Sequence, residues 1–171
     1  MGKFVTCLGL MTALVLSAGP AFAEPEKEPL VVFGLGAASE WGVKDGSSKY
    51  GVEASLETTV VKEWLKVELG VSPVFGDGET KWNTELLFKK PFALSENVEV
   101  MPGIGPTWIH KIGADGSLYD SVAGTAVVDL VFWPLPERKI GLHVKPNYSY
   151  DFGGNHDQSF GVTVGFLIAF P

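Results

Sequence analysis

The strongest constraint on the fold is an alternation of apolar and polar residues that runs from Leu30 to the C-terminal end of the chain. It is clearest in the last segment, where one face carries Phe160, Val162, Val164, Phe166, Ile168 and Phe170, and only Leu167 breaks the rule. Successive side chains of a β-strand point to opposite faces, so a period of two indicates strands. The same alternation recurs over 33–38, 50–60, 65–72, 81–89, 98–108, 121–132 and 140–151. No helical segment of convincing length interrupts it, and the sequence therefore predicts an all-β chain of eight strands.

The connections between these segments alternate in kind. Three contain the dipeptides Asp45-Gly46, Asp77-Gly78 and Asp115-Gly116, and a fourth reads Gly153-Gly154-Asn155. Such residues supply the positive φ that tight hairpins require. The other connections are expected near 62–63, 91–97 and 134–139. An up-and-down meander of eight antiparallel strands closes naturally into a small barrel, which is the predicted fold.

The N-terminus has the three parts of a secretory signal peptide. Lys3 precedes an apolar run over 4–16, and the cleavage pattern Ala21-Phe22-Ala23 follows. The apolar run is too short to span a membrane as a helix. We therefore predict cleavage after Ala23, with residues 1–23 as the signal peptide and 24–171 as a single barrel domain. The one cysteine, Cys7, lies in the signal segment, so the exported domain is expected to use neither disulfides nor thiolate chemistry.

Alternation alone does not decide whether the apolar face points inward, as in a soluble barrel around a ligand, or outward towards lipid. Small residues such as Gly34, Gly36, Gly70 and Gly103 recur on the polar face, and they suit the crowded interior of an eight-stranded barrel. Segments of about ten residues, tilted about 45°, span roughly 23 Å, close to a membrane's apolar band. These features favour a transmembrane barrel.

Aromatic residues gather at the two ends of the predicted strands, as expected where rings lie at membrane interfaces. The set towards the Asp-Gly connections is Trp41, Tyr50, Phe75, Trp82, Trp108, Tyr119, Tyr150 and Phe160, and the set at the opposite end is Trp64, Phe92, Trp133 and Phe170.

From Leu30 to Phe170 the chain resembles small eight-stranded outer-membrane β-barrel proteins, such as the transmembrane domain of outer membrane protein A. The most specific element is the last strand, in which Phe166, Ile168 and Phe170 look like the aromatic-ended signal that the family's assembly machinery reads. The chain departs from the family in Pro171, which follows the final aromatic, and in four prolines within strands, Pro73, Pro102, Pro106 and Pro146. The resemblance implies an outer-membrane location, with membrane lipid and the barrel-assembly machinery as partners.

Nine ionisable residues are expected on the polar face: Glu57, Lys66, Glu68, Glu85, Lys89, Glu99, Asp129, His143 and Lys145. An unpaired charge is costly in a lumen too narrow for bulk water, so these residues are predicted to form a satisfied ion-pair network, with Glu85 beside a lysine such as Lys66 or Lys89. The alternatives are a proton or ion path, or carboxylates in acid–base catalysis. In a soluble barrel the same residues would form a solvated face.

Other chemistry finds little support in the sequence. His156-Asp157-Gln158-Ser159 is the only cluster of its kind, and its histidine and serine point to opposite faces of a strand, so we interpret it as a turn. No metal-binding spacing, phosphate loop or dinucleotide motif occurs, and neither cofactor nor metal is expected. A net charge of −7 argues against a nucleic-acid partner.

The sequence thus predicts a non-enzymatic integral outer-membrane protein with a structural or surface-interaction role, whose surface partner it does not name. Three alternatives stay open: a lipid-modifying barrel enzyme, a narrow pore, and a soluble periplasmic barrel that binds an apolar ligand.

Overall fold

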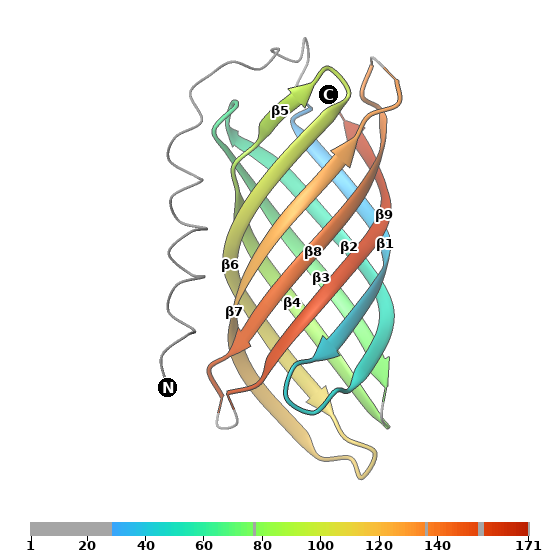
Figure 1. The fold of residues 1–171 in the computed structure, drawn as a ribbon, viewed down its shortest axis with the longest axis vertical. Coiled ribbons are helices and arrows are strands. Elements are labelled where there is room, and N and C mark those ends of the chain that lie inside the picture. Colours follow the sequence, from blue (N-terminus) through green and yellow to red (C-terminus); the bar gives the residue numbers. More distant parts are fainter. Residues whose placement is uncertain (1–28, 77, 136, 154–155, 171) are drawn as a thin grey trace.

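The computed structural model describes residues 29–170 except 77, 136, 154 and 155. Its strands are β1 (Val31–Gly42), β2 (Ser48–Val61), β3 (Leu65–Gly76), β4 (Glu79–Lys89), β5 (Phe92–Ser95), β6 (Val98–Ile112), β7 (Leu118–Phe132), β8 (Ile140–Asp151) and β9 (Gln158–Phe170). Neighbouring strands pair antiparallel, β1 pairs with β9, and β4 pairs with β6, so the sheet closes into a barrel of tilted strands (Figure 1). The predicted fold class is confirmed. The predicted signal segment and its cleavage residues Ala21 and Ala23 lie outside the described residues.

The fourth strand of the barrel is divided in two. Both β4 and β5 pair with β6, and Lys90 and Pro91 separate them. The sequence-based prediction placed 91–97 in a connection, which is wrong for Phe92–Ser95, because this segment continues the strand and leaves only Glu96 and Asn97 for the turn. The barrel therefore has the eight strand positions that were expected. The position shared by β4 and β5 is interrupted at Pro91, because proline cannot donate a ladder hydrogen bond.

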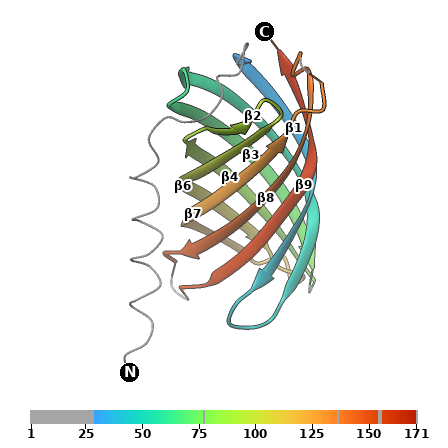
Figure 2. The same ribbon diagram turned by 45° about the horizontal axis from the view of Figure 1, so that its top comes forward.

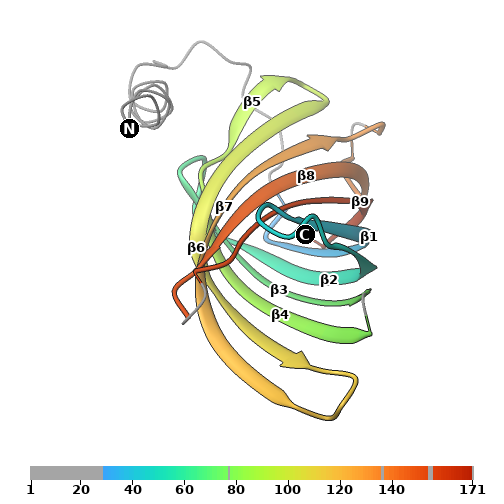
Figure 3. The same ribbon diagram turned by 60° about the horizontal axis from the view of Figure 1, so that its bottom comes forward.

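The two ends of the barrel differ in their connections. The connections β1–β2, β3–β4, β6–β7 and β8–β9 lie at one end, called here the loop end (Figures 1 and 2). The other connections lie at the opposite end, called here the terminal end, where β1 begins and β9 stops. Gly46, Gly78 and Gly116 have φ angles of 68°, 74° and 79°, as predicted for glycines of tight hairpins. Viewed from the loop end, the strands encircle the barrel axis (Figure 3).

The prolines within strands lie beside gaps in the ladder. The pairing of β2 with β3 passes from Gly51–Val74 directly to Ala54–Val71, so Pro73 is skipped on that side, while it remains paired with Trp82 on the other. Because an antiparallel residue directs its N–H and C=O to one neighbouring strand, a missing N–H interrupts the ladder on one side only. The same gap on one side and pairing on the other are found at Pro102, Pro106 and Pro146.

The side chains sort by face. Large apolar residues such as Leu86, Phe88 and Leu130 are exposed on the outside, whereas the buried interior is rich in charged residues. This is the reverse of a soluble barrel with an apolar ligand cavity and is the arrangement of a transmembrane barrel. Among the described residues, no helix is long and apolar enough to cross a membrane.

Two aromatic residues of the predicted interfacial sets lie on the inner face instead. Trp133 was expected in the outer aromatic set at the terminal end, but its side chain is turned into the barrel and is 1% exposed. Tyr119 was expected in the set towards the loops, but it lines a cavity at the loop end, where its ring lies 5.4 Å from Lys111 Nζ. Both residues have the same parity along the chain as the inward-facing Asp129 and Val131, so the alternation agrees with the structure and the aromatic pattern was misleading.

Candidate functional site

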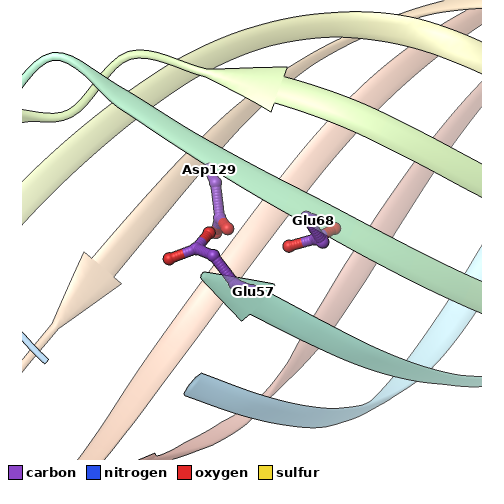
Figure 4. Close-up of side chains that lie close together, drawn as sticks. All are labelled: Glu57, Glu68 and Asp129. Atoms are coloured by element: carbon purple, nitrogen blue, oxygen red, sulfur yellow. The ribbon is translucent and has the colours of Figure 1, made fainter. Parts of the chain in front are cut away.

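The centre of the barrel interior is a cluster of three carboxylates around one lysine. Glu57 on β2, Glu68 on β3 and Asp129 on β7 point towards one another, with carboxylate oxygens within 4.8 Å (Figure 4). Such a trio could hold a metal ion, but Lys89 of β4 supplies the cation instead. Its Nζ lies 2.7 Å from Glu68 Oε2 and 2.9 Å from Asp129 Oδ2, and it also contacts Glu57. The cluster is thus a lysine ammonium held by three acids.

The network continues towards the terminal end. Lys66 Nζ lies 3.5 Å from Glu57 Oε1 and 3.5 Å from Glu99 Oε2. The guanidinium of Arg138 contacts Glu99 and donates to the carbonyl oxygen of Glu96 at 2.6 Å. Through these contacts the turn that carries Arg138 is tied to the barrel interior.

The network also extends towards the loop end. Lys145 of β8 contacts Glu53 of β2, and its Nζ donates to Glu68 Oε1 at 2.8 Å. Glu53 in turn accepts a hydrogen bond of 2.6 Å from Thr163 Oγ1 on β9. Contacts between residues so distant in sequence fix the register of the strands around the whole barrel.

All nine residues that the sequence singled out lie buried in this interior: Glu57, Lys66, Glu68, Glu85, Lys89, Glu99, Asp129, His143 and Lys145. His143 Nδ1 lies 3.3 Å from Asp129 Oδ1. Glu85 was predicted to lie beside Lys66 or Lys89, and this is wrong. The lysine near it is Lys145, whose Nζ is 3.9 Å from Glu85 Oε2.

The predicted network omitted other charged residues that line the interior, among them Glu40, Lys49, Glu53, Lys81, Arg138 and Asp151. Alternation already placed Glu53 and Lys81 on the polar faces of their strands, but it did not indicate which charges they meet. Lys81 donates to Glu40 Oε1 at 2.6 Å, nearer the loop end than the residues considered. Arg138 follows a turn and has a φ of 49°, so no periodic signal indicated that its side chain enters the barrel.

The terminal end is closed by apolar side chains. Val32, Met101, Val131, Trp133 and Leu167 form a buried cluster inside the barrel. This explains why Leu167 breaks the alternation of the last strand: an apolar residue is required at that inward position. The interior therefore combines an apolar cluster at the terminal end with a polar network between that cluster and the loop end.

The loop end is open. A cavity of about 320 Å³, called here the vestibule, is lined by residues of the loops and of the adjoining strand ends, among them Glu40, Lys81, Lys111 and Tyr119. Hydrogen bonds from the backbone and hydroxyl groups of Ser47 hold the pKa of Asp45 at its rim below the ordinary value. The Asp157 carboxylate lies 3.5 Å from Lys111 Nζ.

The cluster His156-Asp157-Gln158-Ser159, interpreted above as a turn, spans the end of the connection between β8 and β9 and the start of β9. His156 stacks against Tyr150 with ring centroids 6.0 Å apart, and Ser159 lies in β9.

The residues considered as an assembly signal lie on the outer surface of β9. Phe166, Ile168 and Phe170 are exposed there, on the face expected to contact lipid. They are thus accessible from outside the barrel.

Solved structures with the same architecture are small outer-membrane barrels and surface proteins. Neisserial surface protein A matches with a TM-score of 0.66 and 11% identity over 82% of this chain and 96% of that one. Outer membrane protein OprG from Pseudomonas aeruginosa matches with a TM-score of 0.64 and 12% identity over 84% and 97%. Ail, the attachment invasion locus protein of Yersinia pestis, matches with a TM-score of 0.62 and 13% identity over 84% and 100%. No protein-family model and no curated protein matches the chain.

These matches place the chain in a class defined by fold, that of small eight-stranded transmembrane barrels. Identities of 11–13% establish the shared architecture and nothing more specific.

Proposed function

We propose that the protein is an integral outer-membrane barrel with a structural or surface-interaction role and without enzymatic activity. The observation that carries this proposal is the inversion of faces: apolar side chains surround the barrel, and charged side chains fill it. Such a surface is stable only in lipid, because water would face an extended apolar band.

The interior supports a structural role over a wide pore. The Lys89 cluster crosses the middle of the barrel, and the apolar residues around Trp133 occupy the terminal end. Beyond these two layers, the described residues line the vestibule at the loop end. A role at the surface would fall to the short loops that surround it, and Ail, the attachment invasion locus protein, is a fold neighbour consistent with such a role.

The predicted export signal and the aromatic last strand support delivery to the outer membrane. We propose that the signal is removed after Ala23 and that Phe166, Ile168 and Phe170 are read by the barrel-assembly machinery. The exposure of these three side chains on β9 is what supports this role.

Fractionation of the native envelope tests the location. The protein is expected to stay with the outer membrane after carbonate extraction, since its apolar band is buried in lipid. Release with the periplasmic contents would contradict the proposal.

A closed barrel in which every strand is paired is expected to resist SDS until it is heated. Unheated and boiled samples of the purified protein should therefore run at different positions on a gel. A variant that cannot close, made by deleting β9, is the control and should run at one position. Equal mobility of the two wild-type samples would argue against a stable closed barrel.

A further inference from the structure

A second, smaller space lies next to the vestibule, deeper inside the barrel. This chamber has a volume of about 20 Å³, and its lining includes Glu40, Glu53, Asn83, Glu85, Thr107 and Thr163. It exceeds the roughly 10–15 Å³ that one water-sized occupant needs. Glu40 and Lys81 line both the chamber and the vestibule, so the two spaces adjoin on the side of the loop end.

Two oxygens in the chamber lining lack hydrogen-bond partners. Among the residues that the structure describes, neither Asn83 Oδ1 nor Glu85 Oε2 receives a hydrogen bond. Both residues are 7% exposed and belong to β4. A buried acceptor left unsatisfied costs about 1–3 kcal/mol, and more if it is charged, so two such acceptors on the inner face of β4 indicate that a donor or cation binds there. Both are acceptors, and the occupant must therefore be a donor or a cation.

The charges near the chamber are not balanced. Glu40, Glu53 and Glu85 face Lys81 and Lys145, and Lys145 is shared with Glu68. Glu40 is satisfied by Lys81 at 2.6 Å, and Glu53 by Lys145 and Thr163. Glu85 has only the 3.9 Å approach of Lys145, which is longer than a hydrogen bond. Of the three carboxylates at the chamber, Glu85 therefore has the longest contact with a cation.

We propose that the chamber binds one alkali-metal cation, held by Glu85 Oε2 and Asn83 Oδ1. A hard cation prefers carboxylate and amide oxygens, which are the groups left free here. A water molecule alone would donate to both oxygens but would leave the buried negative charge uncompensated.

The geometry favours a monovalent over a divalent ion. A tight calcium site usually contains several carboxylates that balance its two charges. Within the described part of the chain, the one trio of acids close enough to share a metal is Glu57, Glu68 and Asp129, and Lys89 occupies it. The chamber offers one carboxylate without a close partner, which matches a single charge.

Crystals of the full-length processed barrel grown in rubidium chloride test this proposal. An anomalous peak is expected beside Glu85 and Asn83 in the wild type and should vanish in Glu85→Gln, which keeps the shape but removes the charge. Glu79→Gln is the matched control, because Glu79 lies at the vestibule rim with a side chain that is 44% exposed, and the peak should remain there. Absence of the peak in the wild type, or its persistence in Glu85→Gln, would overturn the proposal.

Equilibrium dialysis with radioactive Rb⁺ gives a second measurement that does not depend on the folding of Glu85→Gln. Asn83→Asp adds a carboxylate to the chamber, and Rb⁺ affinity should rise by about tenfold, equivalent to about 1.4 kcal/mol. Unchanged Rb⁺ binding in this variant would contradict the site. The proposal goes beyond the outer-membrane role, which would survive its failure.

Discussion

At the scale of single residues, the protein depends on charges that are buried but matched. Lys89 illustrates the arrangement, because its ammonium is shared by Glu57, Glu68 and Asp129, and its side chain has no exposed surface. Removing two or more charges from water is costly, and only good geometry offsets that cost. Removing one member of the cluster is therefore expected to destabilise the barrel more than replacing the whole cluster with apolar residues would.

Replacing Lys89 with methionine should strongly destabilise the barrel. The change leaves three carboxylates facing one another without their cation, and we expect a loss of about 3–5 kcal/mol in the free energy of unfolding. Urea unfolding of the barrel refolded into lipid vesicles measures it. Lys139→Met is the control, because Lys139 pairs with Glu137 on the surface with side chains 72% and 69% exposed, and it should cost less than about 1 kcal/mol. Equal effects of the two changes would show that the cluster does not stabilise the barrel.

Glycines on the inner face differ in how closely the neighbouring strand approaches. A Cβ added to Gly105 would lie 1.9 Å from the backbone oxygen of Leu86, whereas one added to Gly70 would meet nothing nearer than 3.8 Å. Gly105→Ala should therefore cost about 1–3 kcal/mol, the usual range for overpacking, and Gly70→Ala should be tolerated. Midpoints of urea unfolding for the two variants test this, and a tolerated Gly105→Ala would contradict the close approach of β4 and β6.

At the scale of elements, each strand presents one face to lipid and the other to the interior. In β4, Leu86 is on the outside, and Leu87, which has no exposed surface, is inside with Glu85. The segment formed by β4 and β5 places Leu86 near its middle, where the membrane is most apolar.

Leu86→Arg should impair assembly into membranes, because arginine on the lipid face near mid-membrane costs about 2–4 kcal/mol. Folding yield into vesicles, read as the heat-dependent change of gel mobility, measures the effect. Leu94→Arg is the depth control, since Leu94 is also exposed but lies in β5 at the terminal end, where the cost falls to about 0–1 kcal/mol. Single cysteines at 85, 86 and 87 give an independent readout. Lipid-phase quenching of a label at 86 alone is expected, and quenching at 85 or 87 would contradict the orientation of β4.

At the scale of the whole molecule, the barrel interior is open at the loop end and filled by apolar side chains at the terminal end. The vestibule and the chamber lie on the side of the loop end, the ion-pair network lies in the middle, and the apolar cluster around Trp133 lies at the terminal end. The wild type should therefore carry no steady current across a planar bilayer.

Trp133→Ala should open the terminal end of the barrel. Trp133 is the largest fully buried side chain, and truncating such a residue costs about 3–5 kcal/mol because a cavity remains. Urea unfolding measures the loss, and single-channel recording tests whether current appears. Trp64→Ala is the control, because Trp64 lies between β2 and β3 at the same end and is 57% exposed, and it should be close to neutral for both measurements. A steady wild-type current would contradict the seal.

The sequence by itself determined the strands, their two faces and the positions of most turns. These are local properties: the period of two depends on neighbouring residues, and Gly46 or Gly116 marks its turn through its own backbone. Apolar length and small inner residues were also enough to indicate which face meets lipid. The segment Phe92–Ser95 was misplaced because periodicity does not say where a strand ends. Trp133 was misplaced because it was assigned to an outer aromatic set, although its parity with Asp129 and Val131 indicates the interior.

Only the tertiary structure decided which charges meet. Lys145 contacts Glu53, 92 residues away in the chain, and Thr163 donates to the same carboxylate across 110 residues. Such pairs depend on the closure of the sheet and the stagger of its tilted strands, which no short-range pattern encodes. For the same reason the sequence could place Glu85 inside the barrel but could not show that the strands around it leave its carboxylate beside a chamber, without a close cation.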